Sequence, residues 1–231
     1  MIDLESRFEQ LGFSDAARED LYAVLVRKDT GLEMLMRKLM QHVEMESGQI
    51  EQRILPIVIQ QCLIHLADDM ADGDCDYLSI EKASTTLCSL FNLSALLLLE
   101  VNLSPETCKR FYQLMARVGI LQHEEIRTSH WTLEETRKAA FDLGGAVYAG
   151  YFSLALDGTP LADEAESLGR HFGIASFVAR DIQTDDARYL DLDQQERSSL
   201  RNWALKSANH LYEKELEPLN PLLLSAYRYL R

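Results

Sequence analysis

The sequence predicts an all-α fold, and three observations support it. Glycine and proline are sparse, with 11 and 5 in 231 residues, so few positions break a helix. Apolar residues recur every three or four positions, as in Leu32, Leu35, Met36 and Leu39, which is the spacing of one helix face. Alternation of apolar and polar residues, the pattern of a half-buried strand, is hard to find anywhere in the chain.

Apolar spacing places the first helices. It predicts helical segments around residues 4–11, 21–25 and 32–43, and a further helix over 54–67 that continues to Asp72 if the acidic residues there are helical. The most apolar run, residues 93–103, contains Glu100 and is too short to span a bilayer. We therefore predict a buried helix there.

Capping signals place the later helices. Ser104 followed by Pro105 predicts a helix start, with the helix running to about residue 127. Thr132 and Glu135 form a capping box for a helix that runs to about 156, and the turn 157–160 precedes another over 161 to about 185. The interior glycines of the 132–156 helix indicate either close helix packing or a kink beside a ligand: Gly144, Gly145 and Gly150. The C-terminal segment reads as a packed final helix or a dimer surface.

Composition restricts the class of protein. No repeat, low-complexity segment or linker divides the chain, so one domain over residues 1–231 is expected. A net charge of -14 argues against binding to nucleic acid or an anionic membrane. The four cysteines form no CxxC pair, and the N-terminus lacks the features of a secretory signal. We expect a reduced, cytoplasmic protein with no transmembrane segment and no zinc site.

An acidic cluster follows the apolar helix in the stretch LIHLADDMADGDCDY, residues 63–77. In a helix that reaches Asp72, the carboxylates of Asp68 and Asp72 stack at i and i+4, with Asp69 adjacent. Repulsion between these carboxylates and the helix dipole both disfavour this arrangement. A divalent cation bound between the carboxylates makes their interaction energy favourable. A solvated acidic helix end explains the same residues without a ligand.

A second acidic box, GRHFGIASFVARDIQTDDARYLDL at residues 169–192, favours the metal hypothesis. Asp181 and Asp185 are again at i and i+4, and Arg180 precedes them. Carboxylates on two helices that face a cavity suit Mg²⁺, which takes one or two carboxylates and completes its shell with water and phosphate oxygens. A diphosphate is the expected ligand.

These motifs resemble those of class I isoprenoid synthases, the all-α trans-prenyltransferases and terpene synthases. DDMAD at 68–72 resembles their first aspartate-rich motif, and the helix before Asp185 resembles that of the second. ARDIQTDDARYL is similar to the arginine-aspartate box of squalene and phytoene synthases. LQHEEI at 121–126 and RKAAFDLGGAVYAG at 137–150 match a glutamine-acid pair and a lysine-containing helix of the family, and the order agrees over residues 53–192. The short chain resembles a divergent branch that includes the prenyltransferase of the moenomycin lipid chain.

The resemblance implies a helical bundle around a central cavity, a homodimer, and Mg²⁺-dependent ionisation of an allylic prenyl diphosphate. Carried over, the catalytic and metal-binding residues are Asp68, Asp69 and Asp72 in the first box and Asp181 and Asp185 in the second. The residues expected to contact the diphosphate are Lys138, Arg180, Arg188, Arg53 and Gln122. Ordinary surface ion pairs account for the four cationic residues equally well, and an interhelical hydrogen bond accounts for Gln122.

Departures from the family pattern limit the prediction. Residues 48–56 offer only Arg53, and the segment after the first box has no arginine, although chain-elongating synthases use paired arginines there for isopentenyl diphosphate. Ile182, Val178 and Phe177 replace polar residues of the known second motifs. We therefore predict prenyl transfer to an unknown acceptor. The alternatives are a terpene cyclase acting on a C15 or C20 diphosphate, a non-catalytic helical relative that acts as a binding partner, and an unrelated helical bundle.

Overall fold

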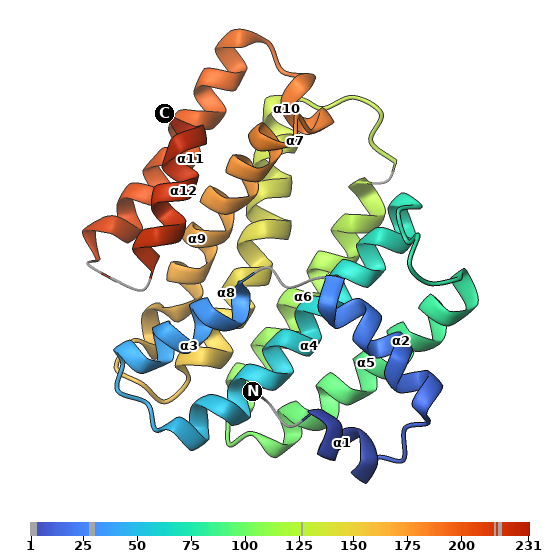
Figure 1. The fold of residues 1–231 in the computed structure, drawn as a ribbon. Helices are drawn as coiled ribbons and strands as arrows, with labels where there is room; N and C mark the ends of the chain where they lie inside the picture. Colours follow the sequence, from blue (N-terminus) through green and yellow to red (C-terminus); the bar gives the residue numbers. More distant parts are fainter. Residues whose placement is uncertain (1–3, 28–30, 126, 215, 217–218) are drawn as a thin grey trace. The chain divides into compact units, whose positions relative to one another are not determined.

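The computed structural model describes residues 4–27, 31–125, 127–214, 216 and 219–231, and these residues form helices with no strand among them. The predicted all-α class is therefore confirmed. The chain divides into two compact units, one of residues 1–37 and 45–102 and the other of residues 38–44 and 103–231. Figure 1 shows the helices of both units in chain order by colour. The single domain over residues 1–231 stays a prediction.

The first unit is built around a pair of long helices. It contains α1 (Leu4–Gln10), α2 (Asp15–Arg27), α4 (Ser47–Asp72) and α5 (Ile80–Glu100), while α3 (Leu32–His42) crosses the division between the units. The helix α4 packs along α5, and α2 contacts both. Their shared core is apolar and includes Phe8, Leu21, Leu55, Ile59, Cys62, Leu66, Leu90, Leu93 and Leu97. The predicted continuation of the 54–67 helix to Asp72 is confirmed.

The apolar run 93–103 is only partly buried. α5 ends at Glu100, and Leu93 and Leu97 lie in the core. Leu96 and Leu99 of the same run are 37% and 84% exposed. The prediction of a buried helix is therefore correct for only one face of the run. The apolar residues extend around more of the helix circumference than the face that packs against the core.

The second unit contains the helices of the C-terminal part of the chain. Its helices are α6 (Pro105–Glu125), α7 (Leu133–Ala139), the π-helical turn η1 (Ala140–Gly144), α8 (Gly145–Leu156), α9 (Ala162–Gln183), α10 (Ala187–Leu190), α11 (Gln194–Glu213) and α12 (Asn220–Leu230). Both predicted starts are confirmed. Ser104 Oγ accepts a hydrogen bond from the Thr107 N–H at 3.1 Å, and Thr132 and Glu135 form a reciprocal capping box.

Glycines bring α8 and α9 into backbone contact, and Figure 1 shows the two helices side by side. A Cβ atom on Gly169 would lie 2.2 Å from the Tyr148 carbonyl oxygen, and one on Gly173 would lie 2.1 Å from the Gly144 carbonyl oxygen. A Cβ atom on Gly144 itself would lie 2.6 Å from Phe177 Cβ. The interpretation of close helix packing is therefore confirmed. The chain also forms a π-helical turn at the same place, and a kink beside a ligand stays a prediction.

Three helical stretches are long and apolar enough to cross a membrane by length and composition alone: residues 47–72, 80–100 and 133–156. Within the described fold, 83% of the apolar window of the third stretch is buried, which matches its place in the core of the second unit. The expectations of no transmembrane segment and of a cytoplasmic location stay predictions.

Gly173→Ala will destabilise the protein by about 3 kcal/mol or more, because the added methyl group meets the backbone of Gly144 and Gly145 where η1 joins α8, and backbone cannot move away as a side chain would. Gly119→Ala is the matched control, since a Cβ atom on this exposed glycine of α6 meets nothing within 4 Å. It should stabilise the protein by roughly 0.5–1 kcal/mol. Urea unfolding measures both values, and equal effects of the two substitutions would contradict the close α8–α9 contact.

Candidate active site

The first acidic box forms the last turn of α4. Asp68 and Asp69 are half-buried and Asp72 is exposed. Gly73 ends the helix with φ 78°, and the N–H groups of Gly73 and Asp74 both donate to the Asp69 carbonyl oxygen. The three carboxylates therefore gather at the negative end of a 26-residue helix, where the dipole disfavours them. A cation at this helix end removes that cost.

Tyr77 holds one carboxylate of the first box. Its hydroxyl donates a hydrogen bond to Asp69 Oδ2 at 2.8 Å, and its ring packs against the core of the first unit. Burial, followed by the bond to Asp69, raises the pKa of Tyr77 well above its usual range. The hydroxyl therefore stays protonated and fixes the orientation of the Asp69 carboxylate. Tyr77 was not among the predicted site residues, although it ends the acidic stretch 63–77 in the sequence.

The helix α4 carries further polar residues before the box. Arg53 is buried, so the expected surface ion pair is wrong for this residue. It lies fifteen positions before Asp68 in one helix, a separation of about 22 Å at 1.5 Å per residue. The structure therefore does not bring Arg53 together with the first box.

The second acidic box differs from its expected helical form. α9 ends at Gln183, and Asp185 is exposed with φ 52°. The predicted helical stacking of Asp185 on Asp181 is therefore wrong, because the chain leaves the helix before Asp185. Aspartate tolerates this left-handed conformation better than most residues.

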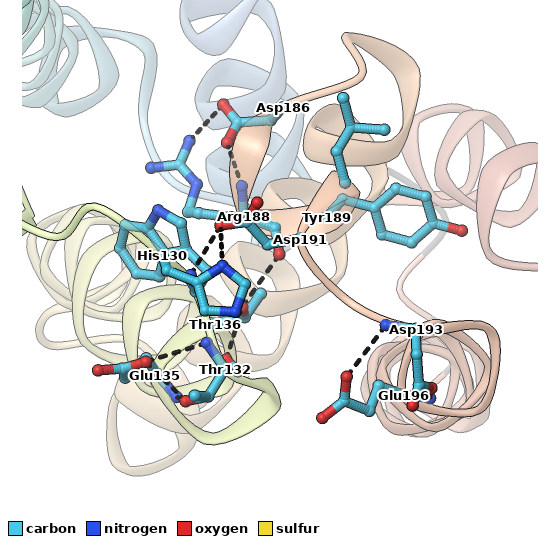
Figure 2. A network of polar contacts seen from close by, with 12 residues as sticks. His130, Thr132, Glu135, Thr136, Asp186, Arg188, Tyr189, Asp191, Asp193 and Glu196 are labelled. Atoms are coloured by element: carbon cyan, nitrogen blue, oxygen red, sulfur yellow. Dashed lines mark hydrogen bonds and ion pairs between the residues drawn. The ribbon is translucent and has the colours of Figure 1, made fainter.

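Arg188 joins the second box to its neighbours, as Figure 2 shows in part. Its guanidinium donates to both oxygens of the fully buried Asp181 at 3.2 and 3.3 Å, to Asp186 at 2.8 Å, and to Glu125. The same group lies 4.8 Å from the centre of the Phe177 ring. Asp186 was not among the predicted site residues, whereas Glu125 belongs to the predicted glutamine-acid pair of LQHEEI. Only the fold brings the two to Arg188 and Asp181.

The surroundings of Arg188 tie several helices together. Thr136 of α7 donates to the Arg188 carbonyl oxygen at 3.1 Å, and Asp191 accepts from the Trp131 N–H at 2.8 Å. His130 Nδ1 lies 3.2 Å from the Asp191 carboxylate (Figure 2). Arg188 is thus an internal partner for carboxylates, with 11% of its side chain exposed. Its predicted contact with a diphosphate would require these bonds to break.

Asp181 is an unusual carboxyl group. Burial raises the pKa of Asp181 to about 8, the negative charge of Asp186 acts in the same direction, and the positive charge of Arg180 lowers it. A cation that binds Asp181 near neutral pH therefore competes with a proton and with Arg188. Removal of a carboxylate from water explains why burial is the largest effect.

The remaining predicted contacts lie elsewhere in the second unit. Lys138 pairs with Glu124 at 3.1 Å, and both side chains are more than half exposed. Arg180 is exposed, and its guanidinium lies 5.5 Å from the centre of the Phe177 ring. Gln122 is half-buried on α6, one turn before Glu125. Of these three, Arg180 is the residue next to the second box.

The donor set suits magnesium. Among the described residues, no group of three or more His, Cys, Asp or Glu side chains is already arranged around a single ion. Mg²⁺ does not require such a cage, because it accepts one or two carboxylates and keeps water or phosphate oxygens for the rest of its shell. The hard oxygens of Asp68, Asp69 and Asp72 fit this preference.

Comparison with known proteins shows the fold. No family model and no curated protein matches the chain. A geranyltranstransferase from Thermotoga maritima is similar in structure, with a TM-score of 0.76, 13% sequence identity and coverage of 98% of this chain and 95% of that one. A deletion mutant of a heterotetrameric geranyl pyrophosphate synthase from mint has a TM-score of 0.64, 14% identity and coverage of 95% and 96%.

These similarities confirm the predicted isoprenoid synthase-like helical fold. At 13% and 14% identity the likeness concerns the fold and not the reaction. The resemblance to the branch with the moenomycin-chain enzyme stays a prediction.

Arg188→Met should lower the free energy of unfolding by about 3–5 kcal/mol, because it leaves carboxylates crowded around an apolar side chain. Arg110→Met is the control. Arg110 pairs with the single carboxylate of Glu166 and is 45% exposed, so its loss should cost at most about 1 kcal/mol. Urea unfolding at pH 7 compares them, and a loss under 1 kcal/mol for Arg188→Met would contradict the assigned role.

Proposed function

We propose that this protein is a Mg²⁺-dependent prenyltransferase that ionises an allylic prenyl diphosphate and transfers the carbocation to an acceptor. The observation that carries the proposal is the cluster of Asp68, Asp69 and Asp72 at the end of α4, in a chain with the fold of isoprenoid synthases. The names of the two similar structures, geranyltranstransferase and geranyl pyrophosphate synthase, support prenyl diphosphates as the substrate class.

The first box holds the leaving group in this proposal. Mg²⁺ bound by these carboxylates supplies positive charge that stabilises the departing diphosphate. The Tyr77 hydroxyl already orients the Asp69 carboxylate. The side chain of Asp69 therefore loses less conformational freedom when the ion binds. Asp68 lies one turn before Asp72 on the same face of α4.

We propose Asp181 and Asp185 as the metal ligands of the second box. Asp181 is bonded to Arg188, so a cation gains access only when that guanidinium turns away. Asp185 is exposed beyond the end of α9. A cation can therefore reach its carboxylate without any unwinding of the helix. We propose Arg180, Lys138 and Gln122 as contacts of the diphosphate, with Arg180 the strongest of the three because it is exposed directly beside Asp181.

Apolar surroundings and aromatic rings favour cation chemistry in the second unit. Tyr148, Phe152 and Phe172 pack with ring centres 4.9 to 5.9 Å apart. Rings stabilise a nearby positive charge through their electron-rich faces, and a dry site keeps water from quenching the cation. Packing alone also explains this cluster, so the aspartates and not the rings carry the proposal.

The decisive measurement is diphosphate release from geranyl, farnesyl and geranylgeranyl diphosphate, with and without Mg²⁺ and isopentenyl diphosphate. Asp69→Asn should lower Mg²⁺-dependent release at least about 100-fold, because it removes a charge that holds the ion at the leaving group. Asp74→Asn is the matched control, since Asp74 is exposed just after the helix end. It should retain full release.

Product analysis in the same assay separates the alternatives. Longer prenyl diphosphates would indicate chain elongation, and cyclic hydrocarbons would indicate a terpene cyclase. No release from any substrate, together with no Mg²⁺-dependent diphosphate binding, would favour the non-catalytic relative and contradict the proposal.

We also propose that the protein forms a homodimer through α5. Phe91 and Leu99 are 55% and 84% exposed on this helix, and exposed apolar clusters often mark protein interfaces. Leu99→Glu should weaken the dimer at least tenfold by placing a charge in the interface, as measured by sedimentation equilibrium. Leu224→Glu on α12, where Leu224 is 60% exposed, is the control, and a wild-type protein that sediments as a monomer would contradict this proposal.

A further inference from the structure

Two histidines meet where α11 packs along α9 in the second unit. His171 is on α9 and His210 is on α11, and the two helices lie side by side in Figure 1. The centres of the two rings are 4.4 Å apart, and the ring planes are tilted by 40°. Both residues are half-buried. The imidazole rings are therefore in direct contact across the interface between the helices.

Neither ring of this pair is joined to a carboxylate among the described residues. His130 shows the contrast, because its ring lies 3.2 Å from the carboxylate of Asp191. A carboxylate stabilises a protonated imidazole, whereas a second imidazole in contact becomes a like charge when it is protonated too. The contact between His171 and His210 therefore suits neutral rings.

The carboxylates near the pair on α9 and α11 are already paired or exposed. Arg170, next to His171, donates to Glu166 at 3.1 Å. Glu164 of α9 is paired with Lys214 of α11, and both side chains are partly exposed. The remaining charged residues within four positions of either histidine are exposed: Lys206 and Glu213. Water or another cation therefore already compensates these carboxylates.

The other helices that pack on α9 add no carboxylate to this contact. Neither α8 nor α12 contains an acidic residue. The carboxylate of η1, Asp142, is paired with Arg117 at 2.8 Å. Arg188 of α10 meets α9 at Asp181, ten residues beyond His171 and about 15 Å along the axis. The titratable side chains of α8 and α12 are Tyr148, Tyr151, Tyr227, Arg228 and Tyr229.

These surroundings make the stability of the fold depend on pH. Burial lowers the pKa of His171, and the positive charges of His210 and Arg170 act in the same direction. The unfolded chain therefore binds more protons than the fold as the pH falls. The stability that this histidine contributes is complete above the unfolded pKa of about 6.5 and is lost as the pH falls through the folded pKa.

The two ends of α11 are attached differently. Near its N-terminal end, Arg137 of α7 donates to Ser199 Oγ at 2.9 Å, and Arg197 donates to the Tyr189 carbonyl oxygen at 3.1 Å. These bonds do not involve a group that titrates near neutral pH. Near the C-terminal end, within the described part of the chain, the histidine contact and a partly exposed ion pair join α11 to α9. Acid therefore weakens the C-terminal end first.

We propose that the contact between His171 and His210 is a pH-sensitive switch, which holds the C-terminal half of α11 on α9 at neutral pH and releases it in mild acid. Two charged imidazoles in contact repel each other, and partial burial keeps water from stabilising either charge. Because the rings interact, they titrate as a coupled pair. The inference goes beyond the proposed reaction and does not depend on it.

Urea unfolding of the wild type and of the double variant His171→Gln/His210→Gln tests the switch. The unfolding equilibrium constant is measured at pH 7.5 and pH 5.5, and one histidine that stays neutral in the fold raises it about tenfold over this range. The rise should therefore be at least about fivefold larger in the wild type than in the double variant. His123→Gln is the control, since His123 is exposed on α6, and it should show the wild-type rise.

Hydrogen exchange locates the release in the wild-type protein. After correction for the intrinsic exchange rate, the amides of residues 206–213 should exchange at least about fivefold faster at pH 5.5 than at pH 7.5. The amides of residues 197–203 should change by less than about twofold, because the arginine bonds hold that end of α11.

Three results would overturn the inference. The first is an equal rise of the unfolding constant in the wild type and the double variant, and the second is equal acceleration of exchange along the whole of α11. The third comes from an NMR titration of the wild-type histidines, which also decides if the double variant does not fold. His171 should take up its proton below about pH 6.5, and protonation at or above that pH contradicts the switch.

Discussion

The second unit depends on the direct contact between the backbones of α8 and α9. Gly169 and Gly173 place the α9 backbone against the carbonyl groups of Tyr148 and Gly144, with no room for a side chain between them. Because a helix is rigid over its length, this contact also sets the position of its C-terminal end, which carries Asp181. The glycines cost helix propensity, and the dense packing of two apolar helices offsets that cost.

Crowding of negative charge is the second constraint, and the two acidic boxes meet it in different ways. In the first box, the αL cap at Gly73 ends the helix immediately after Asp72, and Tyr77 donates to Asp69. In the second, the Arg188 guanidinium is bonded to carboxylates from three parts of the chain. The second box therefore already contains a positive group of its own, which a metal ion at Asp181 would have to displace.

Local patterns in the sequence determined the all-α class, the helix starts at Ser104 and Thr132, and the first acidic box at the end of α4, because caps and helix faces depend on residues a few positions apart. The sequence could not determine that α9 stops before Asp185, that Asp186 and Glu125 meet Arg188, or that Tyr77 binds Asp69. These facts depend on which segments pack together and on how much water they exclude, and burial of a polar group is decided by neighbours distant in sequence, which only the tertiary structure supplies.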